Sequence, residues 1–152
     1  MLSVGNQQWD SEYPANSDFQ NDINNKKLWV VEMSDGGIGG VIAITNDQYE
    51  QYTECGWDIT GIAMVPHRVC VNPKYRKCGI GQKLYKQVEI IARERGINCL
   101  RVDTYNENEA MCNLILKMGY KFGGNMELTF PKSGLKGTWN CYEKILQLNN
   151  SE

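Results

Sequence analysis

The sequence predicts an α/β fold in which several consecutive hairpins adjoin two amphipathic helices, rather than a regular βαβ alternation. A pattern of helical period starts at Ile80 and stops at Gly96. Short apolar runs separated by turn residues lie on both sides of this helix and indicate strands. The length of 152 residues suits one domain, residues 1–152, with a single sizeable core.

The first half of the chain is predicted to contain a short helix and a hairpin. Ser17 and Gln20 have the spacing of a capping box, which predicts a helix that ends near Asn25. Pro66 is expected to disturb a later strand, because proline cannot donate to a ladder. Strands are predicted at residues 28–33, 38–45 and 61–71. A turn at residues 35–37 joins the first two strands, and residues 46–60 are predicted to form a loop or an irregular helix.

The second half continues with a strand, a second helix and two closing strands. An apolar stripe at helical spacing predicts that the second helix ends at Gly119. A loop rich in glycine joins the last two strands. The strand is expected at residues 99–105, the second helix at 108–118, and the two closing strands at 120–130 and 138–147.

Composition excludes several classes of protein. No apolar run reaches about 18 residues, so no membrane-spanning helix is predicted. The N-terminus lacks the basic and apolar regions of a secretory signal. The six cysteines form no Cys-x-x-Cys pair and His67 is the single histidine, so no metal site is predicted. We therefore expect a cytoplasmic protein with reduced thiols.

The charges are unevenly distributed, although the net charge is only −2. Residues 1–60 hold ten acidic residues against two lysines, whereas residues 72–101 hold eight basic residues against two acidic ones. Most single charges of this kind are solvated. A basic block that is only local disfavours nucleic acid as a partner, because the remaining surface would repel phosphates.

The segment from Val69 to Leu84 predicts a phosphate-binding loop. An apolar run ends at Asn72, a basic loop follows, and Gly79 and Gly81 open the helix. Glycines leave the backbone accessible to an anion, and the first N–H groups of a helix have no intrahelical partner. A pyrophosphate-bearing cofactor is therefore expected.

Three classes of cofactor are bound by glycines in this way. The nucleoside-triphosphate string Gly-x4-Gly-Lys-Ser/Thr is absent. The dinucleotide fingerprint lacks its third glycine, where Leu84 stands, although Asp103 at the end of the next strand keeps a nicotinamide-dependent oxidoreductase open as an alternative. The wide basic loop between Val71 and Gly79 argues against the tight turn of that fingerprint and leaves coenzyme A as the third class.

Two blocks of the sequence resemble the GNAT N-acetyltransferase superfamily. Residues Arg76–Gly81 read Arg-x-x-Gly-x-Gly, which is similar to the family's coenzyme A signature. Residues Asn108–Tyr120 resemble a later block, in which an Asn precedes an apolar helix that ends Lys-x-Gly-Phe/Tyr. The resemblance covers residues 68–120 and implies a small, single-domain, bacterial-type member. Its fold would be a mixed, mostly antiparallel twisted sheet with a splayed central pair of strands and flanking helices.

The resemblance also implies where acetyl-CoA binds. Main-chain groups near Val69 and Val71 would pair with the pantetheine arm, and Asn108 would contact the same arm from the second block. Backbone N–H groups of the glycine loop would hold the pyrophosphate. The loop residues implied are Arg76, Lys77, Cys78, Gly79, Ile80, Gly81 and Gln82.

The implied reaction transfers an acetyl group from acetyl-CoA to a primary amine by direct attack in a ternary complex. An alkylammonium has a reference pKa of about 10.4, so the amine must lose a proton before it attacks at neutral pH. His67 is the first candidate for the base, with Glu54 and Asp103 behind it.

The acid that protonates the leaving thiolate is harder to assign. The family often places a Tyr seven residues after the Asn, and Ile115 occupies that position here. Tyr120 is the candidate substitute, with Tyr105 as another, or the thiolate leaves unassisted. The missing Tyr also motivates a second function, a non-catalytic coenzyme A-binding regulatory domain.

The acceptor is weakly encoded. Acidic and aromatic residues within 47–58 could line a site for a cationic amine, either a small molecule or a peptide. Residues 1–26 form an atypical N-terminal region, in which we expect the family's usual first strand and helix to be missing or replaced. A missing first strand would expose a sheet edge, which makes a homodimer a candidate assembly.

Overall fold

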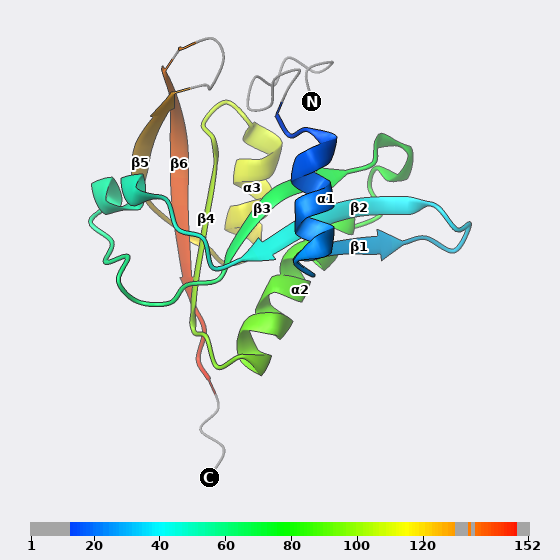
Figure 1. Ribbon diagram of the computed structural model, residues 1–152, viewed down its shortest axis with the longest axis horizontal. Helices are drawn as coiled ribbons and strands as arrows, with labels where there is room; N and C mark the ends of the chain where they lie inside the picture. Colours follow the sequence, from blue (N-terminus) through cyan, green and yellow to red (C-terminus); the bar gives the residue numbers. More distant parts are fainter. Residues whose placement is uncertain (1–12, 130–133, 135, 149–152) are drawn as a thin grey trace.

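The computed structural model describes residues 13–129, 134 and 136–148. Three α-helices, six strands and two 3₁₀ helices, labelled η, lie within these residues (Figure 1). In chain order they are α1 (Asn16–Asn24), β1 (Leu28–Glu32), β2 (Ile38–Thr45), η2 (Glu50–Cys55), β3 (Val65–Val71), η3 (Pro73–Tyr75), α2 (Ile80–Glu94), β4 (Cys99–Tyr105), α3 (Glu109–Lys117), β5 (Lys121–Thr129) and β6 (Lys136–Ile145).

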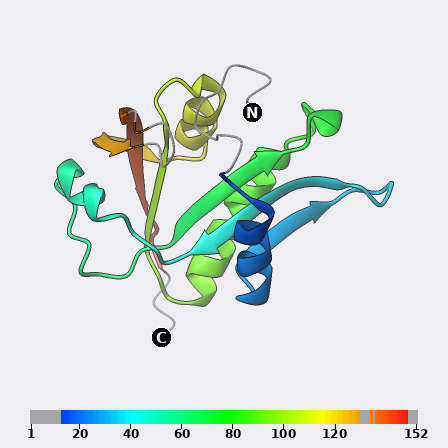
Figure 2. The same ribbon diagram turned by 45° about the horizontal axis from the view of Figure 1, so that its top comes forward.

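The strands form two antiparallel three-stranded sheets, in the orders β1-β2-β3 and β4-β6-β5. In the described part of the chain the sheets meet through one parallel bridge, between Met64 and Leu100. There the Met64 N–H donates to the Cys99 carbonyl at 2.9 Å, and the Arg101 N–H donates to the Met64 carbonyl at 3.0 Å. Beyond the bridge β3 and β4 run apart (Figures 1 and 2). The predicted splayed pair of strands is confirmed.

Two apolar clusters hold the sheets together. The larger is built on α2, whose apolar stripe follows helical spacing and packs against the strands of both sheets; its members include Ile80, Leu84, Val88, Ile91, Ile42, Leu100, Val102 and Ile115. Helix α1 lies on the opposite face of the first sheet (Figures 1 and 2). The smaller cluster lies beneath η2 and contains Tyr52, Val65, Tyr105, Met126 and Trp139. The two faces of the β3–β4 gap therefore have different surroundings.

Most predicted elements are confirmed. The strands β2 and β4 have the predicted bounds, and the turn between β1 and β2 closes through the Met33 N–H and the Gly37 carbonyl at 2.8 Å. The irregular helix expected within 46–60 is η2. None of the helices in the described part of the chain combines the length and apolar character needed to cross a bilayer.

Three local predictions were wrong. The helix near the N-terminus is capped by Asp18, whose carboxylate accepts the Ala15 N–H at 2.7 Å, and not by the pair Ser17 and Gln20. The strand predicted from residue 61 begins only at Val65. Pro66 lies inside that strand without breaking it. Because strand residues alternate and Met64 bonds to β4, the nitrogen of Pro66 faces the gap, where no ladder partner is lost.

The predicted absence of the family's first strand concerns residues that include 1–12, which lie outside the described residues. Helix α1 precedes β1, so a helix is present in this atypical N-terminal region.

Candidate functional site

Asn72 fixes the end of β3 against β2. Its N–H donates to the Gly39 carbonyl at 2.8 Å, and its side-chain amide donates to the Ile38 carbonyl at 3.0 Å. Its side-chain oxygen accepts the Lys74 N–H at 3.0 Å, which starts the turn η3. The loop that follows therefore leaves the sheet at a fixed point.

Asp35, in the turn between β1 and β2, holds the other side of this loop. It accepts the Tyr75 hydroxyl at 2.8 Å and pairs with the Lys74 ammonium at 3.1 Å. Hydrogen bonds from Gly37, Tyr75 and Lys74 lower the pKa of Asp35 to about 2. The charge of Lys74 is thus engaged within the protein.

The next residues form the glycine loop, residues 76–81, and remain open to solvent. Arg76, Lys77, Cys78 and Gly79 are exposed, and neither Arg76 nor Lys77 forms an ion pair with any described carboxylate. Gly79 adopts φ +71° and precedes α2 without a side-chain cap. The first N–H groups of α2 therefore follow two exposed cations in the chain, an arrangement that suits a bound anion.

The two glycines of the loop have different structural roles. A Cβ at Gly79 would meet no atom within 4 Å, so the space over this backbone is open. A Cβ at Gly81 would lie 2.6 Å from the Leu114 side chain. Gly81 therefore lets α2 approach α3, a role that the phosphate argument did not predict. Ile80 is buried in the core, so only its backbone is available to a ligand.

The backbone of β3 is arranged as the resemblance implied for Val69 and Val71. The Asn72 N–H points to β2, and strand residues alternate, so the main-chain N–H and C=O groups of Val69 and Val71 point toward the gap that β4 has left. The alternation is interrupted at Arg68, which has φ +52° and lies at a shift of register between β2 and β3. This bulge lies where the two sheets separate.

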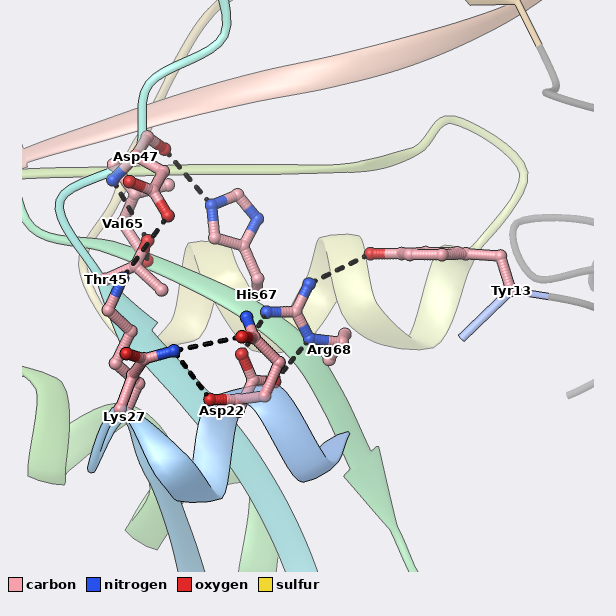
Figure 3. Close-up of polar contacts among 10 residues, drawn as sticks. Tyr13, Asp22, Lys27, Thr45, Asp47, Val65, His67 and Arg68 are labelled. Carbon is pink, nitrogen blue, oxygen red and sulfur yellow. Dashed lines mark hydrogen bonds and ion pairs between the residues drawn. The ribbon is translucent and has the colours of Figure 1, made fainter. Parts of the chain in front are cut away.

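An ion pair from α1 holds the bulge, as Figure 3 shows. The Arg68 guanidinium donates two hydrogen bonds of 2.6 Å to the carboxylate of Asp22, which is 2 % exposed, and a third of 3.2 Å to the Tyr13 hydroxyl. Sequence reasoning missed both Arg68 and Asp22. No local pattern could have paired them, because they are 46 residues apart.

His67 lies beside this bulge, and its hydrogen-bond partner indicates which ring nitrogen carries a proton (Figure 3). The Nε2 atom is 3.1 Å from the main-chain oxygen of Asp47. A carbonyl oxygen only accepts hydrogen bonds, so Nε2 carries a proton. The ring of Tyr49 packs edge-on against the imidazole at 5.7 Å. In the neutral imidazole, Nδ1 is then the nitrogen with a lone pair.

Asp103 lies across the gap on β4. Its carboxylate accepts the Tyr52 hydroxyl at 2.5 Å, and burial raises its pKa while the charge of nearby His67 lowers it. We call Tyr49, Tyr52, His67 and Asp103 the His67–Asp103 cluster. Glu54, the other candidate base, is on the far side of η2, where it accepts the Glu127 N–H at 3.3 Å.

The residues of the second block have structural roles. The Asn108 side chain caps α3 by accepting the Met111 N–H at 3.2 Å. Ile115 is fully buried, and its aliphatic side chain has no proton to donate. Tyr120 is 3 % exposed, packs edge-on against Tyr85, and its hydroxyl has no hydrogen-bond partner among the described residues. Burial raises the pKa of Tyr120 well above its ordinary value.

The described residues contain no group of three His, Cys, Asp or Glu side chains that could hold a metal ion. Cys78 is exposed and its thiol contacts the Arg76 carbonyl at 3.6 Å, within its own loop.

Known proteins share this fold. The family model for the acetyltransferase (GNAT) family matches residues 3–120. A search of curated proteins finds no match. Among solved structures, a Staphylococcus aureus protein assigned as an acetyltransferase is 28% identical, with a TM-score of 0.68 over 90% of this chain and 83% of that one.

Two further structures share the fold at lower identity. A GNAT-family acetyltransferase from Streptococcus agalactiae is 24% identical, with a TM-score of 0.76 over 96% of this chain and 82% of that one. A Salmonella typhimurium protein assigned as an acetyltransferase, solved with its cofactor acetyl-CoA, is 15% identical, with a TM-score of 0.69 over 95% and 82%. Because the family model spans well over half of its residues, the chain belongs to the GNAT acetyltransferase family.

Proposed function

We propose that the protein transfers the acetyl group of acetyl-CoA to a primary amine by direct attack in a ternary complex. The observation that carries this proposal is the glycine loop beside the splayed strand β3. It presents N–H groups without a side-chain cap, and two exposed cations, Arg76 and Lys77, that pair with no described carboxylate. Membership of the GNAT family and the acetyl-CoA bound to the Salmonella relative support it.

The donor would lie along the gap between β3 and β4. The pyrophosphate would accept hydrogen bonds from the backbone of residues 77–82, with Arg76 nearby. The pantetheine arm would pair with the main chain of Val69 and Val71, which points into the gap. Asn108 would contact the same arm through groups other than the lone pair that accepts the Met111 N–H.

His67 would act as the base. The amine nitrogen attacks the thioester carbonyl carbon, a C–N bond forms, and the C–S bond breaks to release the coenzyme A thiolate. His67 Nδ1 takes the proton that the amine loses, because Nε2 is engaged with the Asp47 carbonyl. This proton transfer is what a His67→Gln variant removes.

We propose that the thiolate leaves without a side-chain acid. Ile115 offers no proton, and Tyr120 is enclosed in the core. A thiol has a reference pKa of about 8.5, so the thiolate is an adequate leaving group. The role of Tyr120 as the acid stays a prediction, as do the homodimer, the cytoplasmic location and the single-domain organisation of residues 1–152.

The first experiment measures cofactor binding. Thermal-shift titrations with acetyl-CoA, NADH and ATP should give a rise in Tm with acetyl-CoA alone, because a ligand that binds only the folded state stabilises it. Arg76→Ala should weaken acetyl-CoA binding, whereas the matched control Lys74→Ala should not, since Lys74 already pairs with Asp35. A shift with NADH and none with acetyl-CoA would favour the nicotinamide alternative.

The second experiment measures the chemistry. His67→Gln should lower kcat about 10²–10⁴-fold on any amine that the wild-type protein acetylates, with an unchanged Kd for acetyl-CoA. An unchanged pH profile of turnover in this variant would remove His67 from the mechanism.

A second candidate function is a coenzyme A-binding regulatory domain without turnover. The burial of Ile115 at the position of the family's usual acid favours it. Tight binding of acetyl-CoA, with no transfer to any member of a broad amine panel and no hydrolysis, would support this function over the first.

A further inference from the structure

We propose that the carboxylate of Asp103, held by Tyr52, binds the ammonium group of the acceptor at the mouth of the β3–β4 gap, so that the acceptor is a cationic amine. This inference rests on the proposed acetyltransferase function and specifies the acceptor that the same site would take.

The position of Asp103 is the first argument. Leu100 and Met64 form the bridge between the sheets, and Asp103 and His67 each lie three residues beyond it on diverging strands. Val102 belongs to the cluster built on α2, so its neighbour Asp103 faces the opposite side of the sheet, as His67 does. The carboxylate and the imidazole therefore flank the same gap from the face opposite α2.

The charge of Asp103 is the second argument. Among the described residues, no Lys or Arg lies within ion-pair distance of this partly buried carboxylate. The hydroxyl of Tyr52 donates to it, but burial still raises its pKa. A carboxylate in such a place is costly unless it is paired, so its site fits a cation that arrives with a ligand.

The arginines near this site are already engaged. Arg68 donates to Asp22 and Tyr13. Arg101 donates to Glu143 at 2.8 Å and stacks on the ring of Trp57 at 4.8 Å. Because both guanidinium groups have other partners, a cation that pairs with Asp103 would come from the acceptor.

The aromatic side chains are the third argument. Tyr52 and Tyr49 pack edge-to-face at 5.9 Å, and Tyr49 packs against His67. Burial raises the pKa of both tyrosines, so both stay neutral at pH 7. Tyr52 is fully buried, so its contribution is the hydrogen bond to Asp103, whereas Tyr49 is 36 % exposed and its neutral ring could attract an ammonium group through its negative face. An anionic acceptor would meet repulsion here.

The same carboxylate would assist the reaction. The bound ammonium group first gives one proton to His67 Nδ1, because only the neutral amine can attack. Attack on the thioester then places a positive charge on the acceptor nitrogen, and the fixed negative charge of Asp103 stabilises that state until the second proton passes to the departing coenzyme A thiolate. Asp103 would thus bind the acceptor and His67 would deprotonate it.

The test compares two probes of equal shape on the protein saturated with coenzyme A. Benzylammonium carries the charge, and benzyl alcohol does not. Calorimetric titration should show that the wild-type protein binds benzylammonium on the order of tenfold more tightly, because a hydrogen bond to a charged partner is among the stronger ones. Asp103→Asn should abolish this preference, whereas the matched control Glu50→Gln, an exposed carboxylate on η2, should keep it.

Two results would overturn the proposal: a wild-type protein that shows no preference between the probes, and an Asp103→Asn variant that keeps the preference. If Asp103→Asn does not fold, Asp103→Ser replaces it in the same comparison. The affinity for acetyl-CoA is measured separately on each variant and should not change. If the wild-type protein does not bind acetyl-CoA, the proposed function is contradicted instead. Failure of the acceptor proposal and failure of the proposed function can therefore be distinguished.

Discussion

The glycine loop and the His67–Asp103 cluster lie along the same gap between β3 and β4, but they are built in opposite ways. The donor side comes from one continuous segment, Val69–Gln82, and presents mainly backbone groups. The acceptor side takes side chains from β3, β4 and η2, and its central hydrogen bond joins residues 51 positions apart. In the proposed function, a short local motif would bind the donor, while side chains that only the tertiary fold brings together would select the acceptor.

The largest effect is expected where α1 supports the acceptor side. Arg68→Ala leaves the Asp22 carboxylate buried without its partner, and we expect the free energy of unfolding to fall by about 3–5 kcal/mol. Denaturant unfolding measures this loss. Lys27→Ala is the control, because its 3.7 Å pair with Asp47 is exposed and contributes about 1 kcal/mol or less. Equal effects of the two substitutions would show that α1 does not hold the bulge.

A smaller effect is expected on the donor side. Gly81→Ala places a Cβ 2.6 Å from the Leu114 side chain, so we expect a loss of about 1–3 kcal/mol of stability through overpacking. The double variant Gly81→Ala, Leu114→Ala should lose less than the sum of the two single variants, because the smaller side chain relieves the clash. Additive losses would mean that Gly81 is needed for another reason.

The Tyr120→Phe variant tests whether Tyr120 is a buried residue without a catalytic role or the acid that protonates the leaving thiolate. Because the hydroxyl is buried with no described partner, its removal should leave the free energy of unfolding unchanged or raise it by about 1 kcal/mol. The kcat should stay within a factor of two or so if the thiolate leaves unassisted. A large loss of kcat with an intact fold would establish Tyr120 as the acid.

The smallest effect concerns the contact of Asp35 with Lys74 and Tyr75. The pKa of Asp35 is lowered to about 2, so its interactions stabilise the folded state above the unfolded pKa and are lost as the pH falls through about 2. The Tm of the wild-type protein should exceed that of Asp35→Asn at neutral pH, and this difference should shrink steadily below about pH 4. A difference that grows as the pH falls would contradict the assignment.

The donor side could be predicted from the sequence because its signals are local. The glycines, the basic residues before them and the helical period after them all lie within a few turns of chain, and β2 and β4 were delimited correctly by their turns. The steric need for a glycine at position 81 could not be predicted, because it depends on contact with Leu114 in another helix.

On the proposed acceptor side, single candidate residues could be predicted from the sequence, but their contacts with one another could not. His67, Asp103 and the tyrosines of 47–58 were each singled out, but nothing in the sequence placed Tyr52 on Asp103 or the Asp47 carbonyl on His67. The Arg68–Asp22 pair left no signal at all, since an arginine at positive φ inside a strand follows no propensity. Long-range contacts of this kind are set by topology.

The most direct test of the account is an amide NMR titration of the protein with coenzyme A. The account predicts that the N–H signals of residues 77–82, together with those of Val69 and Val71, shift with a common affinity, and that those of η2 move little. Absence of shifts in the glycine loop, or shifts confined to η2 and Asp103, would contradict it.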